Sequence, residues 1–329
     1  MIYAIKKYFE ALVVFLDEHK SKVFFAAKIL IAAGLLIFIF NYVDINEILT
    51  AVSNANYIIL FAAFALSFIN VGLQYYKWKI TCEHLLNETN DKKIFSSLFY
   101  GFAAGSFTPA RVGEYFGRAI VFKNKSLLEV TVATLIDKLF PLLMVASLGT
   151  ISSILFLHFY YQVSFYITVS LFIVFFTCLY FIVMLFVNPK FWENILFKKL
   201  KSSAHLNNLF ERLRPLQSLN KKYSLQMTLI SLLFYSCFIL QYSLLVISFS
   251  GNTNVLNYLW AGNLIMFAKT IIPPVSFAEL GIREGASVFF LTYFGETQAV
   301  AFNASIFLFM INVLLPSLVG LIFFFRKND

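Results

Sequence analysis

The chain has 329 residues, of which 60% are hydrophobic and only 13% are charged. Soluble domains carry about 25% charged residues, so this composition excludes an ordinary soluble globular protein. The net charge of +9 would suit a nucleic-acid partner. The basic residues, however, lie between long apolar stretches, which is typical of a membrane protein, and we expect no nucleic-acid partner.

Six stretches are long and apolar enough to cross the hydrocarbon core as helices, which takes about 20 residues each. They lie at about residues 23–42, 57–76, 129–158, 165–187, 226–249 and 298–325. No segment remains to build a soluble core once these stretches are assigned. The sequence therefore predicts an all-α integral membrane protein with a single polytopic domain over residues 1–329.

The distribution of Lys and Arg predicts the orientation, because cytoplasmic loops carry an excess of both. Five basic segments are predicted to be cytoplasmic: 1–22, 77–93, 111–125, 188–224 and the tail at 326–327. They hold all of the 26 basic residues except Lys28, Lys138, Lys269 and Arg283, which fall inside hydrophobic segments. The predicted outer loops contain no Lys or Arg. We therefore expect a multi-pass protein of the cytoplasmic membrane with both termini in the cytoplasm.

Two of the basic segments show amphipathic helical patterns. Residues 2–16 place apolar side chains at helical spacing opposite Lys6, Lys7 and Glu10, which is typical of a helix lying in the membrane interface. Loop 188–224 carries two similar stripes. Two interpretations stay open for that loop, namely short interfacial helices or a solvated connector.

Two further hydrophobic stretches are too short or too broken to be ordinary spans. Residues 94–110 are rich in glycine, and residues 257–274 end in two prolines. Proline removes a backbone donor and pushes the preceding residue out of helical geometry. Because broken backbone at membrane depth is tolerated only inside protein or beside a watery cavity, we predict two re-entrant hairpins. The residues expected to shape them are Pro109, Gly113, Pro273, Pro274, Gly281 and Gly285.

The two broken stretches share a motif. Residues 109–118 read PARVGEYFGR and residues 274–283 read PVSFAELGIR, and both fit Pro-x3-[Gly/Ala]-Glu-x3-Arg. The motifs lie about half the chain apart, and three predicted spans separate them, so the second hairpin should enter from the opposite side. The sequence thus predicts an inverted-topology repeat, with repeat 1 at about 1–160 and repeat 2 at about 165–329, as in secondary transporters. Two unrelated proline-broken loops are the alternative.

Each motif places a carboxylate and an arginine on one helix face, since residues four apart are neighbours. The pairs are Glu114 with Arg118 and Glu279 with Arg283, and Glu284 follows directly. A charged side chain near the bilayer centre costs at least about 2.5–3.5 kcal/mol, so it should be paired or face water. One interpretation is an ion pair that stabilises each hairpin. The other is that a helix N-terminus and an arginine fork together receive a phosphate.

Other polar residues have ordinary explanations. Asp137 and Lys138 are adjacent at the start of the third predicted span, and we expect them to pair with each other near the inner interface. The three Cys and four His residues are scattered, without CxxC or HExxH motifs, so no metal site and no cofactor are predicted. Because no catalytic constellation is found, we do not expect an enzyme.

Both motif regions resemble the signature regions of a known family. Residues 107–119, FTPARVGEYFGRA, and 272–286, IPPVSFAELGIREGA, are similar to those of the lysylphosphatidylglycerol synthase transmembrane family, the flippase-like domain family. The second region matches at Gly281, Arg283, Glu284 and Gly285. It departs at Ala278-Glu279, which replaces a pair of small residues, and Arg118 lies farther from Glu114 than the family arginine often does.

The resemblance implies translocation of an aminoacylated phospholipid or of another lipid-linked headgroup. The headgroup would then be bound by Arg118, Arg283, Glu114, Glu279 and Glu284. In the fused synthases a soluble aminoacyl-transferase domain follows the membrane part, and we expect that activity to be absent from a chain that stops at Asp329. A membrane-embedded enzyme acting on phospholipids or lipid-linked sugars, a small-solute transporter and a partner subunit remain alternatives. The sequence defines neither the lipid nor the oligomeric state.

Overall fold

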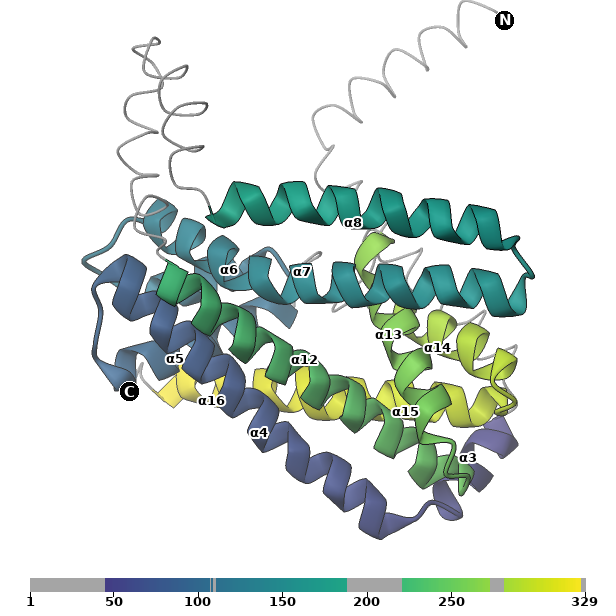
Figure 1. Ribbon diagram of the computed structural model, residues 1–329. Coiled ribbons are helices and arrows are strands. Elements are labelled where there is room, and N and C mark those ends of the chain that lie inside the picture. Colours follow the sequence, from purple (N-terminus) through teal and green to yellow (C-terminus); the bar gives the residue numbers. More distant parts are fainter. Residues whose placement is uncertain (1–44, 107, 109–110, 188–220, 273–280, 327–329) are drawn as a thin grey trace, which may run out of the picture.

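The computed structural model describes residues 45–106, 108, 111–187, 221–272 and 281–326, and every regular element within these ranges is helical (Figure 1). Several predictions fall outside the described residues. They are the span at 23–42, the interfacial helix at 2–16, most of loop 188–224, and Pro109, Pro273, Pro274 and Glu279.

Five helices in the described part are long and apolar enough to cross a membrane. They are α4 (Tyr57–Thr81) continued by the π-helical turn η1 (Cys82–Leu86), α7 (Leu127–Tyr160), α8 (Phe165–Val187), α12 (Lys221–Ser250), and α15 (Gln298–Phe309) continued through η4 (Met310–Leu314) into α16 (Leu315–Arg326). Five of the six predicted spans are thereby confirmed as continuous apolar helices.

The starts of these helices follow from local capping chemistry. Asn56 accepts hydrogen bonds at Oδ1 from the backbone N–H groups of Ile58 and Ile59, so α4 begins at Tyr57. Ser126 and Glu129 form a reciprocal capping box at the start of α7. Each cap satisfies N–H groups that the first helical turn leaves without a partner.

The two broken stretches form pairs of short helices. The first pair is α5 (Asp91–Ser106) with α6 (Gly113–Ile120), and the second is α13 (Val255–Ile271) with α14 (Ile282–Tyr293). A further short helix, α3 (Ile45–Ser53), packs against α15. In the described part the order long helix, short pair, long helix therefore occurs twice, with α8 lying between the two occurrences.

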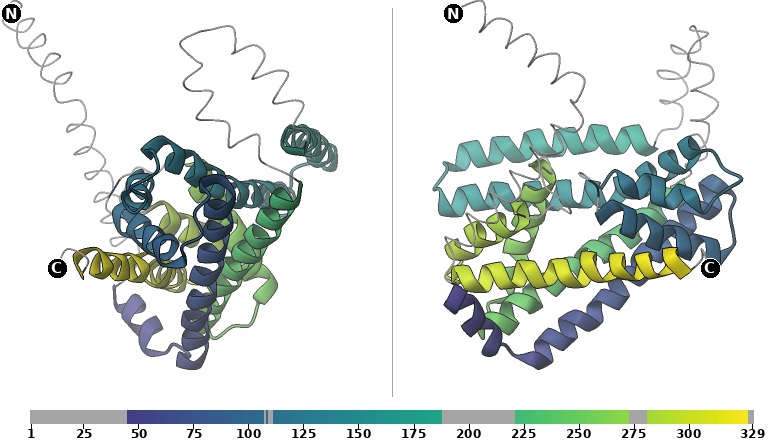
Figure 2. Two further views of the ribbon diagram at one scale, coloured as in Figure 1. Left: turned by 90° about the vertical axis from the view of Figure 1, so that its left-hand side faces the viewer. Right: turned by 180° about the vertical axis from the view of Figure 1, so that it is seen from behind.

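Helices α4 and α12 pack side by side as a tilted, antiparallel pair. In the view of Figure 1, helices α7 and α8 lie above this pair and the continuous α15–α16 rod lies behind it, which Figure 2 also shows. Asn56 N–H donates to Ser248 O at one end of the pair, and Thr81 lies 3.2 Å from the Tyr223 hydroxyl at the other. One apolar cluster lies among α4, α12, α13, α14 and α15, and a second among α4, η1, α5 and α7.

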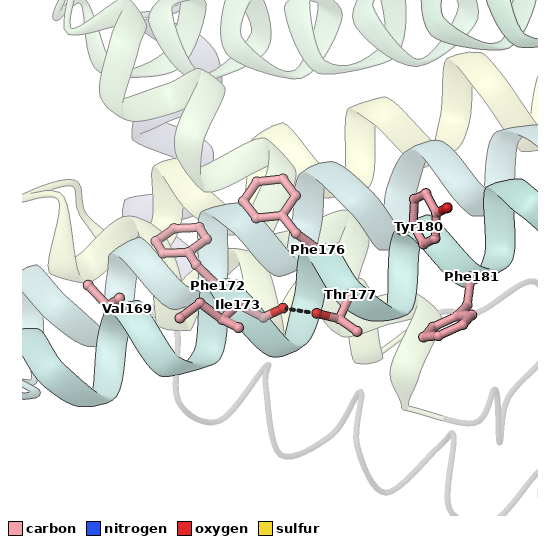
Figure 3. Close-up of a pocket in the computed structure, with 7 residues that line it drawn as sticks. All are labelled: Val169, Phe172, Ile173, Phe176, Thr177, Tyr180 and Phe181. Atoms are coloured by element: carbon pink, nitrogen blue, oxygen red, sulfur yellow. Dashed lines mark hydrogen bonds between the residues drawn. The ribbon is translucent and has the colours of Figure 1, made fainter.

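Helix α8 packs along α7 and leaves most of its side chains exposed. Its apolar outer face carries Phe172, Phe176 and Phe181, with Thr177 Oγ1 bonded to the Ile173 carbonyl of the preceding turn at 2.8 Å (Figure 3). Such a face suits contact with lipid hydrocarbon, where every polar group must be satisfied internally.

Helix α6 packs directly on the backbone of α5 because two glycines lie at the contact. A Cβ added to Gly113 would lie 2.3 Å from the Ala104 carbonyl oxygen, and one added to Gly117 would lie 2.3 Å from that of Tyr100. Small residues four positions apart are the usual way in which membrane helices bring their backbones together. Gly113, which was predicted to shape a hairpin, lies at this helix contact, and the hairpin itself stays a prediction.

Gly117→Ala should therefore destabilise the protein. The new methyl group would meet backbone, which cannot rotate away, and overpacking of this kind costs about 1–3 kcal/mol. Thermal unfolding in detergent would measure the loss. The matched control is Gly72→Ala in α4, where a Cβ would meet nothing within 4 Å, so that change should leave the unfolding temperature equal or higher. Equal behaviour of the two variants would contradict this account of the α5–α6 contact.

Candidate functional site

Six charged side chains come together where α4, α6 and α7 meet. This proximal cluster consists of Lys77 of α4, Glu114 and Arg118 of α6, Asp137 and Lys138 of α7, and Arg111 just before α6.

The proximal cluster is a continuous chain of ion pairs. Lys138 Nζ lies 2.7 Å from Glu114 Oε2, and Arg118 Nη2 lies 2.8 Å from Glu114 Oε1. The other arm of the same guanidinium, Nη1, lies 3.0 Å from Asp137 Oδ2. Lys77 Nζ follows at 3.1 Å from Asp137 Oδ1 and also donates to the Asp137 carbonyl oxygen at 2.7 Å. Arg118 thus bridges the two carboxylates.

The inner part of the cluster is buried, and its edge is open. Glu114, Arg118, Asp137 and Lys77 are at most 5% exposed. Lys138 and Arg111 lie at the edge, with side chains 33% and 25% exposed. Arg111 Nη2 is 3.5 Å from Glu114 Oε2, and its backbone adopts φ +55°, in the left-handed region that non-glycine residues rarely enter.

The charges of the cluster do not cancel. Counted over the described residues, four cations meet two carboxylates, which leaves two positive charges in excess. The buried Nε atoms of Arg111 and Arg118 have no hydrogen-bond partner among the described residues. Because buried charge is costly unless paired, this surplus favours an anionic ligand at the open edge.

Neighbouring residues hold Arg118 in place. Its guanidinium lies 4.2 Å from the ring centre of Trp78, a cation–π contact, and the Trp78 indole N–H donates to Ser97 Oγ at 2.7 Å. Gly101 of α5 leaves the space that the arginine stem fills, since a Cβ there would lie 2.7 Å from Arg118 Cγ. The sequence GFAAG therefore lets α5 pass beside two long charged side chains.

A second, smaller cluster lies on α14 and α15. This distal cluster consists of Arg283, Glu284 and Ser305, all at most 1% exposed. Arg283 Nη2 lies 2.5 Å from Glu284 Oε1, and Arg283 Nε lies 3.1 Å from Ser305 Oγ. Glu284 Oε2 accepts the Gly281 N–H at 2.6 Å, which caps α14, and Gly281 itself has φ +93°. Within the described residues one cation and one carboxylate balance here.

The structure supports some of the predicted site pairs and corrects others. The prediction that Glu114 and Arg118 face each other is confirmed by their 2.8 Å ion pair. The prediction that Asp137 and Lys138 pair with each other is wrong. Successive residues of a helix point about 100° apart, so Asp137 reaches Arg118 while Lys138 reaches Glu114.

Lys77 was not among the predicted site residues. Helix α4 continues past it to Thr81, and Lys77 is 5% exposed inside the proximal cluster, while the cytoplasmic placement of segment 77–93 stays a prediction. Sequence reasoning also missed Arg111 as a neighbour of Glu114, although the spacing of three residues before a helix start was a usable signal.

The two predicted motifs lie on separate helix pairs. No hydrogen bond or ion pair joins the proximal to the distal cluster within the described ranges. Glu279 lies outside those ranges, so its predicted pairing with Arg283 and the predicted cavity shared by both motifs stay predictions.

The fold and the clusters define a polytopic helical membrane protein with buried ionic sites. Residues 25–320 match the family model described as the lysylphosphatidylglycerol synthase TM region, and the chain belongs to this family. Membership implies a lipid-related function in the membrane. No curated protein and no solved structure shows a significant match to the chain.

Proposed function

We propose that this protein moves a phospholipid or another lipid-linked headgroup across the cytoplasmic membrane. The observation that carries the proposal is the proximal cluster, in which two positive charges in excess lie beside an open edge. A lipid phosphate supplies the missing negative charge, and a planar guanidinium suits its oxygens. Family membership supports lipid as the substrate class.

The repeated order of helices supports an inverted repeat with two re-entrant pairs. Helices α5 and α13 have 16 and 17 residues, so each is about 25 Å long at 1.5 Å per residue, which is shorter than the hydrocarbon core of about 30 Å. Their partners α6 and α14 are shorter still. In transporters, pairs of this kind bring helix ends and charged side chains to the middle of the bilayer.

Arg118 and Arg283 would hold the headgroup phosphate in turn while the acyl chains stay in the bilayer. Keeping the chains there avoids exposing them to water, at about 0.8 kcal/mol per CH2. The remaining barrier is the passage of a charged headgroup through hydrocarbon, which fixed cations lower. At the proximal cluster, Lys138 and Arg111 would meet the phosphate first, because they are the partly exposed cations.

The carboxylates would have two roles. They would neutralise the cations when no lipid is bound, and they would bind the cationic part of the headgroup when it is. Glu114 bonds to both Lys138 and Arg118, and it would exchange these contacts with an arriving phosphate. Glu114, Glu279 and Glu284 could also receive an ammonium group on a zwitterionic or aminoacylated headgroup. Exchange of one anion for another keeps the buried cations paired throughout, which limits the cost of each step.

Reconstitution in liposomes tests the proposal against its alternatives. Vesicles with the purified chain should translocate fluorescent phospholipids faster than empty vesicles, without releasing headgroups or taking up small solutes. Headgroup release would indicate an enzyme acting on lipids instead. Solute uptake without lipid movement would indicate a small-solute transporter, and inactivity in all three assays would favour a partner subunit.

The proposed orientation has its own test. In a background without native cysteines, cysteine at position 50 or 253, both exposed threonines, should react with a membrane-impermeant maleimide added outside intact cells. Cysteine at position 92 should react only after permeabilisation, because its basic residues predict that segment 77–93 is cytoplasmic. Protection of both outer positions would reverse the orientation.

A further inference from the structure

A long apolar groove lies between α4, α5 and the η4–α16 segment. This lateral groove has a volume of about 990 Å³ and is walled mainly by apolar side chains. Phe68 and Gly72 of α4, Phe95 and Phe99 of α5, and Leu315 and Val319 of α16 are among its walls. Ligand sites usually measure about 300–1,000 Å³, so a large ligand fits.

The groove and the proximal cluster use different faces of α5. Phe95 and Phe99 face the groove, whereas Gly101 and Gly105 contact the side chains of Arg118 and Glu114. The groove is therefore a separate site, and a ligand held there would not displace any ion pair of the proximal cluster.

One end of the groove is polar. Tyr75, Asp91 and Lys92 line it. Asp91 is already engaged, because Lys79 Nζ lies 2.7 Å from its Oδ1 and the Tyr75 hydroxyl donates to the same oxygen at 3.0 Å. The exposed Lys92 ammonium has no ion-pair partner among the described residues. A groove that is apolar along its length and ends in an unpaired cation matches a phospholipid, which has hydrocarbon at one end and a phosphate at the other.

Gly72 keeps the groove open. It lies in the middle of α4, where glycine destabilises a helix relative to alanine. A Cβ at this position would meet nothing within 4 Å, so none of the described helices requires the glycine. Gly320 of α16 differs, because its Cβ would lie 2.1 Å from the Phe99 carbonyl oxygen. The absence of a side chain at position 72 thus widens the groove and serves no contact with another described helix.

We propose that the lateral groove binds one membrane phospholipid, with an acyl chain along the wall formed by Phe68, Gly72 and Val319 and its phosphate at Lys92. Two of its walls, α4 and the α15–α16 rod, belong to helices long and apolar enough to cross a membrane, so we expect hydrocarbon or protein to occupy the groove. The unpaired Lys92 favours the lipid, because lysine near a membrane surface attracts anionic lipid headgroups. This binding site does not depend on translocation.

Photolabelling tests the site. The full chain is reconstituted in phosphatidylethanolamine–phosphatidylglycerol vesicles that contain phosphatidylglycerol with a diazirine on one acyl chain. After irradiation, mass spectrometry of the digested protein should find lipid adducts at Phe68, Phe95 and Val319 in excess of those at Phe176 on the lipid-facing surface of α8. Gly72→Leu should lower groove labelling to the α8 level, while Gly72→Ala leaves it high. Lys92→Gln should weaken it about fivefold.

The result that would overturn the site is groove labelling equal to that of α8, or unchanged by Gly72→Leu. A photoreactive phenylalanine at position 68 identifies the occupant independently: an adduct of phospholipid mass supports the proposal, and a cross-link to residues 23–42 or to a second copy of the chain contradicts it. Translocation is measured on the same vesicles. Wild-type protein that labels in the groove but moves no lipid would contradict the proposed function and leave the groove site intact.

Discussion

Replacing Arg118 by glutamine should abolish lipid translocation in reconstituted vesicles while the protein still folds and inserts. Arg118 bridges Glu114 and Asp137 and is the most buried arginine of the proximal cluster. Glutamine removes the charge and the fork that would hold a phosphate. The fold should survive, because Lys77, Lys138 and Arg111 still outnumber the two carboxylates. Fluorescent-lipid translocation and size-exclusion profiles, compared at equal expression, measure the two effects.

Conservative and matched variants sharpen this test. Arg118→Lys should restore translocation only in part, because a point charge replaces a bidentate fork. Lys93→Gln removes one positive charge from an exposed residue paired with Glu88 and should have little effect. Undiminished translocation in Arg118→Gln/Arg283→Gln would rule both arginines out as the headgroup site. Loss of folding in Arg118→Gln would favour the ion pair as a purely structural element.

The distal arginine should behave differently. Arg283→Gln should also stop translocation, but it should cost more stability than Arg118→Gln. Glu284 would keep only the Gly281 N–H and Ser305 as described partners, and a carboxylate at 0% exposure would lose its cation. The two motifs are similar in sequence, yet among the described residues the charges balance in the distal cluster and do not balance in the proximal cluster.

Much of the fold was predictable from the sequence, because a membrane-spanning helix can be recognised from the apolar residues of its own segment alone. A run of about 20 apolar residues has few alternatives in hydrocarbon, and five such runs are continuous helices. The Glu114–Arg118 pair was predictable for the same reason, since spacing along one helix fixes which side chains meet. The end of helix α5 at Ser106 agrees with the prediction that residues 94–110 do not form a full span, although Gly101 and Gly105 lie inside the helix.

The composition of the proximal cluster was not predictable, because it depends on which helices become neighbours. Lys77 is distant in sequence from Asp137 and reaches it only through the packing of α4 on α7. Lys77 directly follows a predicted span, a position that is typical of a basic residue in a loop. Asp137 and Lys138 are adjacent in sequence but do not pair, because successive side chains diverge by about 100° on a helix and each reaches a different partner.

The excess positive charge of the proximal cluster should also lower the stability of the protein when no ligand is bound. The two cations at the edge, Lys138 and Arg111, are partly exposed, so water and counter-ions can screen them. The two inner cations, Arg118 and Lys77, are buried from solvent and are not screened in this way. Stability in the empty state should therefore depend most on Asp137, the carboxylate that neutralises the deepest cations.

Asp137→Asn should accordingly destabilise the protein by about 3–5 kcal/mol, which is typical when one partner of a buried ion pair is removed. Asparagine matches aspartate in size and can still accept from Arg118, so the loss would report charge and not shape. Thermal unfolding in detergent, followed by tryptophan fluorescence, measures it, since the fully buried Trp78 contacts Arg118. Glu83→Gln, at the exposed pair with Lys79, is the control and should change little.

A second substitution separates charge imbalance from other causes of the Asp137→Asn loss. Lys77→Met/Asp137→Asn removes one cation together with the carboxylate and returns the cluster to two positive charges in excess. If buried charge is the cause, the double variant should recover much of the lost stability, with a coupling energy of about 0.5–3 kcal/mol between the two sites. Additive losses would show that Lys77 and Asp137 act independently. An Asp137→Asn variant as stable as Glu83→Gln would contradict the central place given to this carboxylate, because a cluster that tolerates three uncompensated cations does not need a phosphate to complete it.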